Sequence, residues 1–213
     1  MITNPHFLRR GTRLYTRIPP HDTRTERVII NTKAYAPWKA EQSKLAAGLL
    51  KGLRISLPET ARILYLGAAS GTTVGHLARL TPNGSILAIE FARIPYAYLL
   101  TLSKTYETII PLLEDARIPE AYAHYAFHFT HIIQDIAQPD QVAILHRNAR
   151  LYATPDTTII LAVKAKSIDA TKPARSVYAR VENDLRKAFT IHWKSTLEPY
   201  EKEHMLYKLS LIQ

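Results

Sequence analysis

The chain has 213 residues, of which 46% are hydrophobic, and a formal net charge of +10. This length and composition can support one hydrophobic core with a small appended subdomain. The absence of cysteine excludes disulfides, thiolate zinc sites and a cysteine nucleophile. Because the sequence has neither a run of eighteen apolar residues nor an apolar signal core, we expect a cytoplasmic protein without a membrane span. The positive charge favours a polyanionic partner, most simply nucleic acid, with a generally basic surface as the alternative.

The first forty residues predict a small antiparallel β unit. Residues 7–18 and 27–32 are rich in β-branched and aromatic side chains, and a turn at residues 19–22 separates them. We place this subdomain at residues 1–36 and the main domain at residues 37–213. Basic residues are concentrated in this unit and in one later stretch, which favours a folded basic face over a charged tail. They are Arg9, Arg10, Arg13, Arg17, Arg24 and Arg27, then Lys164, Lys166, Lys172 and Arg175.

Strand-like and helix-like segments alternate through the main domain. Ser43 is expected to cap a first helix, whose apolar positions recur at helical spacing. This alternation predicts an α/β fold, with a mostly parallel, Rossmann-like sheet covered by helices on both faces. The runs 189–197 and 205–212 have no helix between them and predict an antiparallel hairpin at one sheet edge. Strands are expected to end near Gly67, Phe91, Asp115, Ile136 and Lys164, and helices are expected near 72–80, 95–105, 119–125, 140–150 and 172–188.

A glycine turn follows the first core strand. Gly67 and Gly71 allow a backbone to approach a ligand closely, and Ser70, Thr72 and Thr73 are expected to cap the next helix and offer hydroxyls. Glu90 ends the next apolar run, 23 residues after Gly67, near the spacing at which an acid meets ribose hydroxyls in Rossmann-type sites. The turn is not G-x-G-x-x-G and lacks a P-loop lysine. Together with Glu90 it predicts a nucleoside-cofactor site, and a plain strand–helix connection is the alternative.

Acidic residues recur at the carboxyl ends of the predicted strands, where ligands bind in sheets of this kind. Acids are poor strand residues, so their recurrence at one edge requires a reason. Helix capping could explain Asp115 or Asp135 separately, whereas a cationic cofactor would account for the whole set. The residues at these ends are Gly67, Glu90, Phe91, Glu114, Asp115, Ala116, Asp135, Ile136, Ala137, Gln138 and Lys164.

Several of these segments closely resemble the fibrillarin family, with order and spacing kept from about Ser43 to the C-terminus. The resemblance implies a class I methyltransferase fold, and the lack of a Gly/Arg-rich N-terminal extension makes the chain similar to the archaeal form. Lys166 departs from the asparagine that is usual in the family, which could alter contacts with RNA. The matching segments are 43–47, 65–73, 90–91, 114–117, 135–141, 164–165, 168–169 and 197–201.

The resemblance implies an S-adenosylmethionine-dependent RNA 2′-O-methyltransferase that acts on rRNA, and sometimes on tRNA, inside a box C/D guide-RNA particle. Its expected partners are the guide RNA and target RNA, a Nop-domain scaffold protein and a kink-turn-binding protein. By the same resemblance, the catalytic set is Lys44, Asp135, Lys164 and His204. The expected cofactor contacts are Gly67, Ala68, Thr72, Thr73, Glu90, Phe91, Asp115, Ala116, Asp135, Ile136, Ala137 and Gln138.

Methyl transfer to a ribose hydroxyl is an in-line displacement that requires the hydroxyl to be positioned and its proton to be managed. A lysine amine can help when burial or a neighbouring cation favours its neutral form. We therefore expect Lys164 to deprotonate or orient the hydroxyl, Asp135 to fix the Lys164 ammonium, and Lys44 and His204 to complete the cluster. The simpler interpretations are solvent-exposed lysines, a helix-capping Asp135 and a hairpin histidine. For Phe91, adenine contact and core packing are equal alternatives.

Two other function classes remain open: a non-catalytic RNA-binding subunit and a Rossmann-type NAD oxidoreductase. Three histidines, His124, His128 and His131, lie close together in the sequence. No H-E-x-x-H motif or cysteine accompanies them, so we expect no metal site. The helices near 95–105 and 119–125 are the candidate surfaces for the scaffold protein.

Overall fold

The computed structural model describes residues 1–23, 25–125 and 128–212. Its main sheet has seven strands in the order β12-β13-β11-β10-β7-β8-β9, of which β13 is antiparallel to both neighbours and the central strands are parallel. This arrangement confirms the predicted α/β sheet and its antiparallel C-terminal hairpin. The strand bounds are β7 (Arg62–Leu66), β8 (Ser85–Glu90), β9 (Ile109–Leu113), β10 (His131–Gln134), β11 (Thr158–Lys164), β12 (Phe189–Thr196) and β13 (His204–Leu211).

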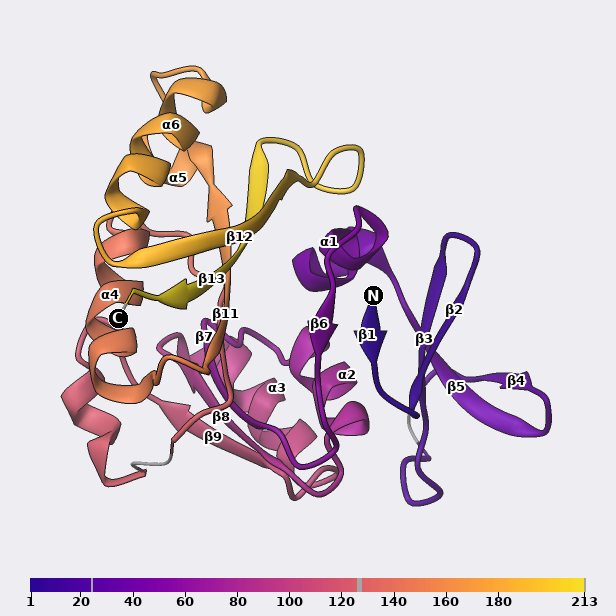
Figure 1. Ribbon diagram of the computed structural model, residues 1–213. Helices are drawn as coiled ribbons and strands as arrows, with labels where there is room; N and C mark the ends of the chain where they lie inside the picture. Colours follow the sequence, from indigo (N-terminus) through magenta and orange to yellow (C-terminus); the bar gives the residue numbers. More distant parts are fainter. Residues whose placement is uncertain (24, 126–127, 213) are drawn as a thin grey trace.

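Helices cover both faces of this sheet (Figure 1). Successive side chains of a strand point to opposite faces, and β7 shows the consequence. Ile63 packs with α1, α2 and α3 in one core, whereas Leu64 packs with α4 and α6 in the other. The helix bounds are α1 (Lys44–Leu50), α2 (Thr72–Leu80), α3 (Arg93–Ser103), α4 (Gln141–Tyr152), α5 (Ala165–Ile168) and α6 (Ala174–Leu185). Among the described residues, no helix is long and apolar enough to cross a membrane.

The segment expected as a helix near 119–125 is instead the 3₁₀ segment η2 (Pro119–Tyr125). Tyr122 interrupts it with φ −118° and ψ 20°. Hydrogen bonds to α4 hold the segment, because the Tyr122 phenol donates to Asn148 and the Tyr152 phenol donates to the Pro119 carbonyl at 2.7 Å. These tertiary contacts replace the i→i−4 bonds of a regular α-helix.

The N-terminal residues form a four-stranded antiparallel sheet in the order β2-β3-β5-β4, beside the main sheet (Figure 1). Its strands are β2 (Phe7–Arg10), β3 (Arg13–Arg17), β4 (Val28–Ile30) and β5 (Lys33–Trp38), and a short η1 (Ala40–Gln42) follows. The strand β5 continues through Trp38 and so crosses the predicted boundary after residue 36. The division into two domains stays a prediction. The sequence did not predict the parallel pair β1 (Ile2–Thr3) and β6 (Ile55–Ser56). Arg24, counted above among the basic residues, lies outside the described residues.

The edge strand β9 contains a proline at its centre. The backbone of Thr108 accepts a hydrogen bond from β8, and the Glu114 N–H donates one back to it. Since alternate residues of a strand point toward opposite neighbours, Pro111 faces the free edge of the sheet. That edge therefore lacks one backbone donor.

A buried ionic cluster joins the four-stranded sheet to α2 and to the loop before β9. Asp22 is 1% exposed, and its carboxylate accepts hydrogen bonds from the Thr25 hydroxyl at 2.6 Å, from Arg79 at 3.3 Å and from the Tyr106 phenol. Arg79 also donates to Thr25 Oγ1 at 2.8 Å, and its guanidinium lies 5.2 Å from the centre of the Tyr106 ring. The cluster thus links residues from three parts of the chain.

Burial alone would raise the pKa of Asp22, but the hydrogen bonds from Thr25 and Tyr106 and the charge of Arg79 lower it from 3.8 to about 2. A carboxyl whose folded-state pKa lies below its unfolded value stabilises the fold above the unfolded pKa. That contribution is lost as the pH falls toward the folded-state pKa.

We expect Asp22→Asn to lower the free energy of unfolding at pH 7 by about 3 kcal/mol, because Arg79 would lose its buried partner. The unsubstituted protein should lose about 2 kcal/mol of stability through this group between about pH 5 and pH 2, and the variant should not show this component. Urea unfolding across this pH range measures both effects. Asp156→Asn, at an exposed position, is the matched control. Equal stability of the two variants at pH 7 would contradict a structural role for the cluster.

Candidate active site

The turn after β7 depends on two glycines with positive φ. Gly67 has φ +80°, and a Cβ there would lie 2.5 Å from the carbonyl oxygen of Asp135 and 2.9 Å from the Ile136 side chain. Only glycine therefore allows the ends of β7 and β10 to approach this closely. Gly71 has φ +88° and forms the N-cap of α2 without any side-chain capping bond. The expectation that a serine or threonine caps α2 is wrong, because the left-handed glycine occupies that position.

A cavity of about 330 Å³ opens beside this turn, at the carboxyl ends of β7, β8, β9 and β10. Its size is that of a small-molecule site. Most of the predicted cofactor residues line it, whereas Ala68, Thr72 and Thr73 are not among the lining side chains. The predicted residues that line it are Gly67, Glu90, Phe91, Asp115, Ala116, Asp135, Ile136, Ala137 and Gln138, and the additional ones are Ala69, Ile89, Glu114, Arg117 and Ile144.

Glu90 is fixed at the end of β8 by the turn itself. Its Oε2 accepts a hydrogen bond from the Ala69 N–H and its Oε1 accepts one from the Ala92 N–H, both at 2.8 Å. A carboxylate oxygen has two lone-pair positions, so each oxygen keeps one for a ligand hydroxyl. Glu90 is therefore buried, oriented and still able to accept hydrogen bonds at the cavity. Phe91, the next residue, is 62% exposed, so the structure places its ring outside the core.

Among the described side chains that line the cavity, the charged ones are mostly acidic, since Glu90, Glu114, Asp115 and Asp135 outnumber one arginine. That arginine, Arg117, binds Asp115 through its side chain, with Nη2 to Oδ2 at 2.7 Å. The hydrogen bonds and charge of Arg117 lower the pKa of Asp115 below its ordinary value. The carboxylates thus favour a cationic ligand, as the strand-end acids predicted.

Asp135, at the end of β10, forms an ion pair with Lys44 from α1. Lys44 Nζ lies 3.0 Å from Oδ1 and 3.1 Å from Oδ2 of Asp135. The expectation that Asp135 fixes the Lys164 ammonium is therefore wrong. Gln134 pairs with Leu161, so Lys164 lies two residues farther along β11 than the level of Asp135. Among the residues that the structure describes, the Lys164 ammonium has no ion pair or hydrogen bond.

Lys164 and His204 are brought together as direct neighbours in the antiparallel pair β11–β13. His204 is 6% exposed, and its Nδ1 lies 2.7 Å from the Lys202 carbonyl oxygen. A carbonyl can only accept, so Nδ1 carries the hydrogen and Nε2 is the acceptor of the neutral ring. The buried Gln141 side chain contacts the backbone N–H and carbonyl of Lys164 at 3.4 and 3.5 Å, which holds the end of β11.

Two buried hydroxyls next to this cluster, those of Ser43 and Tyr65, were not predicted as part of the site. Ser43 caps α1 through the Ala46 N–H, as predicted, and its Oγ also lies 2.9 Å from Thr73 Oγ1. Burial, followed by the charge of Asp135, raises the pKa of Tyr65, so its phenol remains protonated. A tyrosine inside the otherwise aliphatic run of β7 was the available signal, because a buried phenol requires a polar partner.

The three clustered histidines do not converge. His131 is buried in β10, where its Nδ1 lies 2.9 Å from Thr130 Oγ1 and its Nε2 donates to the Ser56 carbonyl at 2.8 Å. Over residues 1–23, 25–125 and 128–212, no group of three histidine, aspartate or glutamate side chains is arranged to hold a metal ion.

The same architecture occurs in solved methyltransferases of unrelated sequence. One from Aquifex aeolicus is 12% identical, with a TM-score of 0.55 over 83% of this chain and 90% of its own. This likeness shows the fold alone, and the fold is that of the class I S-adenosylmethionine-dependent methyltransferases. The chain belongs to the fibrillarin family, since the Fibrillarin sequence model matches residues 8–211.

Individual relatives share much more of the sequence. The fibrillarin-like rRNA/tRNA 2′-O-methyltransferase of Thermoplasma acidophilum is 37% identical over 94% of this chain and 87% of its own length. Aeropyrum pernix fibrillarin, solved with natively bound S-adenosyl-L-methionine, is 38% identical with a TM-score of 0.81 over 92% of this chain and 88% of its own. A fibrillarin solved in a complex with Nop5p is 35% identical with a TM-score of 0.91 over 100% and 99%.

We expect Gly67→Ala to lower the free energy of unfolding by more than about 2 kcal/mol, because a left-handed alanine and a backbone clash add together. S-adenosylmethionine affinity should fall at least tenfold, since the turn and Asp135 both border the cavity. Gly52→Ala is the matched control, because Gly52 has φ +103° with open space around it and should cost only about 1 kcal/mol. Calorimetric titration and thermal unfolding measure the two quantities. Similar losses of affinity in both variants would contradict the close approach at Gly67.

Proposed function

We propose that this protein transfers a methyl group from S-adenosylmethionine to the ribose 2′-hydroxyl of nucleotides in rRNA, and in tRNA, under the direction of a box C/D guide RNA. The observation that carries the proposal is the Lys44–Asp135 ion pair at the border of an acid-lined cavity, in a chain of the fibrillarin family. The Thermoplasma acidophilum relative is described as an rRNA/tRNA 2′-O-methyltransferase, which does not favour a nicotinamide oxidoreductase or a purely structural RNA-binding subunit.

The cavity suits S-adenosylmethionine on three grounds. Gly67 lets the ends of β7 and β10 meet closely at the cavity border, the carboxylates favour a sulfonium cation, and Glu90 retains acceptor positions for ribose hydroxyls. The exposed Phe91 ring offers a face for the adenine. When bound, the cofactor supplies an electrophilic methyl group. Asp115, Ala116 and residues 135–138 complete the proposed contacts, and Thr72 and Thr73 support the turn from behind.

The polar cluster beside the cavity, formed by Lys44, Asp135, Lys164 and His204, positions the target hydroxyl and accepts its proton. Lys44 holds the Asp135 carboxylate in place, so this pair forms a fixed border against which the ribose is positioned. Lys164, whose ammonium is not committed to an acid in the described structure, orients the 2′-oxygen and, in its neutral form, accepts the hydroxyl proton at Nζ. His204 lies beside Lys164, with Nε2 able to accept a hydrogen bond from the substrate.

The target nucleotide is selected by the ribonucleoprotein particle and not by the enzyme alone. Pairing of target RNA with the guide RNA chooses the nucleotide, while a kink-turn-binding protein and a Nop-domain scaffold protein assemble the enzyme on the RNA in the archaeal cytoplasm. An exposed apolar strip at the start of α3 suits the scaffold contact. It consists of Phe91, Ile94 and Tyr98, which are 62%, 77% and 64% exposed. Ile94 and Tyr98 are four residues apart and therefore share one face of the helix.

We expect Lys164→Ala to reduce single-turnover methyl transfer by about 10²- to 10⁴-fold in a reconstituted guide particle, because a positioned proton acceptor contributes this much. S-adenosylmethionine affinity should change less than threefold. Methylated riboses are mapped on the target RNA after incubation with both partner proteins. Lys51→Ala is the matched control, since this lysine is exposed at the C-cap of α1 and has no role in the proposed site. Normal transfer by folded, cofactor-bound Lys164→Ala protein would overturn the assigned role.

We expect Ile94→Asp to weaken binding of a Nop-domain scaffold protein by at least tenfold, because it places a charge in the middle of the apolar strip. Leu151→Asp, at a position 52% exposed on α4, provides an equal change elsewhere. Calorimetric titration of each variant with the scaffold protein gives the two dissociation constants. Equal binding by both variants would exclude the strip as the docking surface.

A further inference from the structure

A second and larger cavity lies between the four-stranded sheet and the main domain. It has a volume of about 1240 Å³, and its walls include Arg17 at the end of β3, Arg79 of α2, and Gly84 and Thr108, which precede β8 and β9. It is therefore located at the amino ends of these parallel strands. Figure 1 shows the loop after β3 at the bottom of the view, on the side where the chain enters β8 and β9. We call it the junction cavity.

The junction cavity is separate from the cofactor site. The cofactor residues lie at the carboxyl ends of the same strands, and β8 has six residues, which corresponds to about 20 Å of extended chain. None of the described residues lines both cavities. A ligand in the junction cavity would thus not compete for the position of the methyl donor.

The lining of the junction cavity is strongly basic. Among the described residues, five cationic side chains and a single carboxylate, that of Glu107, line it. Within the described part of the chain, three of these cations, Arg17, Lys33 and Lys104, have no ion pair or side-chain hydrogen bond. Arg27 donates a hydrogen bond to the Asp22 carbonyl at 3.2 Å. Arg79 is held by Asp22, and its buried Nε has no hydrogen-bond partner.

These features fit a phosphate-bearing polymer better than a small anion. The volume exceeds that of an ordinary small-molecule pocket. The cations without an ion pair among the described residues come from β3, β5 and the end of α3, so they are spread along the cavity and not gathered at one anion-binding loop. Thr23 and Thr108 also line the cavity, and their hydroxyls can donate to phosphate or 2′-hydroxyl oxygens, whereas the Thr32 hydroxyl donates to the Asn31 carbonyl at 2.6 Å. His21 presents an imidazole, which packs edge-on to Tyr106 with 6.1 Å between ring centres and can stack on a base.

We propose that the junction cavity binds the sugar–phosphate backbone of RNA, as a contact distinct from the methyl-transfer site. The inference rests on the proposed function in that it takes RNA to be the polyanion that the protein meets. The cavity contact holds an RNA segment against the N-terminal sheet while the opposite end of the parallel strands holds the methyl donor.

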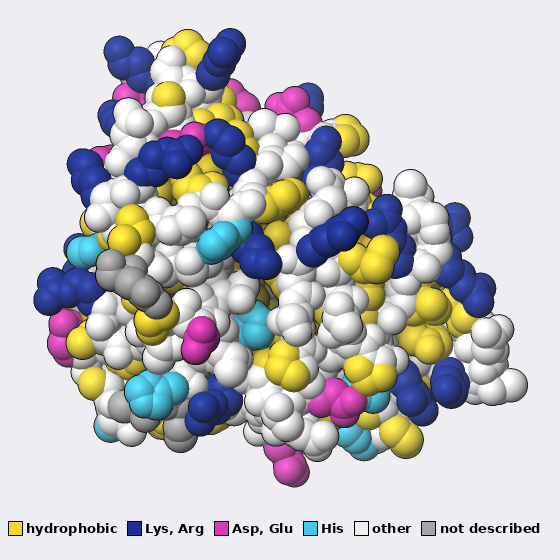
Figure 2. Space-filling view, viewed as in Figure 1, with side chains coloured by type: hydrophobic (Ala, Val, Ile, Leu, Met, Phe, Trp, Pro, Cys, Tyr) yellow, Lys and Arg dark blue, Asp and Glu magenta, His cyan; other side chains and the backbone are white. Residues whose placement is uncertain are grey.

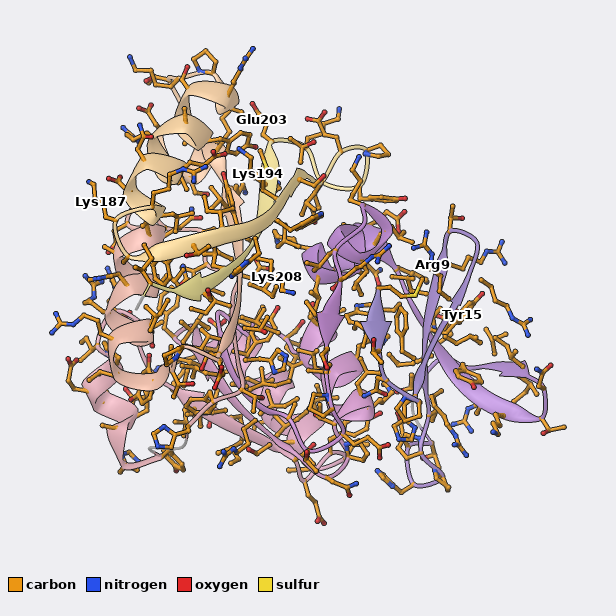
Figure 3. All side chains as sticks on the ribbon, viewed as in Figure 1. Arg9, Tyr15, Lys187, Lys194, Glu203 and Lys208 are labelled. Atoms are coloured by element: carbon orange, nitrogen blue, oxygen red, sulfur yellow. The ribbon has the colours of Figure 1, made fainter. Side chains whose placement is uncertain are left out.

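The test compares two triple variants of the full chain that remove the same charge. The cavity variant is Arg17→Gln, Lys33→Gln and Lys104→Gln. The control variant is Arg180→Gln, Arg186→Gln and Lys187→Gln on and just after α6. Lys187 lies at the left of the molecule in Figure 3, and Figure 2 shows many lysine and arginine side chains around that end. The control variant therefore also reduces a strongly basic surface. S-adenosylmethionine affinity and thermal unfolding establish that both variants are folded.

Fluorescence anisotropy with a labelled 16-nucleotide single-stranded RNA gives the dissociation constant from 50 to 200 mM salt. We expect the cavity variant to bind at least tenfold more weakly at 100 mM salt, and the control variant less than threefold more weakly. The logarithm of the association constant decreases as the logarithm of the salt concentration rises. The slope of this line should be less steep by about 2 for the cavity variant, because each phosphate contact on a single strand contributes about 0.7. Equal weakening by the two variants would overturn the proposal, since it would report net charge alone.

A competition experiment distinguishes a cavity that binds RNA from one that binds a small anion. At constant ionic strength, 1 mM pyrophosphate should leave RNA binding unchanged, whereas displacement of the RNA would overturn the assignment to a polymer. The result is independent of methyl transfer. RNA binding that depends on the cavity in a protein that never methylates would refute only the proposed function, and guided methylation with unchanged RNA affinity in the cavity variant would refute only this inference.

Discussion

The missing side chain at Gly67 is the constraint on which the arrangement of the site depends. It lets the turn after β7 touch the backbone at the end of β10, so that Asp135 reaches the cavity border instead of being held away from it. The same turn presents the Ala69 N–H to Glu90 and thereby orients the acid of the neighbouring strand. One backbone approach therefore positions both carboxylates, that of Asp135 toward the Lys44 ammonium and that of Glu90 toward the cavity.

The N-terminal sheet is integrated with the catalytic side of the molecule through α1 and α2. Trp38, at the end of β5, stacks on His76 of α2 with 4.9 Å between ring centres, and Thr16 of β3 bonds the same imidazole at 2.8 Å. Burial lowers the pKa of His76 to about 3, so this ring stays neutral and packs as an aromatic. The chain then passes from Trp38 through the short η1 into α1, which carries Lys44. The position of that lysine is thus set from two directions, by the N-terminal sheet and by the Asp135 carboxylate.

Much of this arrangement could be predicted from the sequence, because strand ends are marked locally. Gly67 and Glu90 end apolar runs, and the carboxyl ends of parallel strands must meet at one edge, so a shared cavity followed from spacing alone. The choice between two lysines for Asp135 did not follow. Lys44 is 91 residues away in the chain, and only the strand register shows that Lys164 lies beyond the level of the acid. The cap of α2 and the 3₁₀ form of η2 were missed for a similar reason, since a left-handed glycine and hydrogen bonds from α4 override local preference.

Pro111 has a consequence for how the molecule behaves among its own copies. An open sheet edge with a full row of donors and acceptors can recruit a foreign strand, which is a common route to association of native chains. Since the proline in β9 withholds a donor from the middle of that row, an added strand could not form a continuous ladder there. Pro111 therefore disfavours strand addition between copies of the protein at the β9 edge, which is the edge farthest from the β12–β13 hairpin.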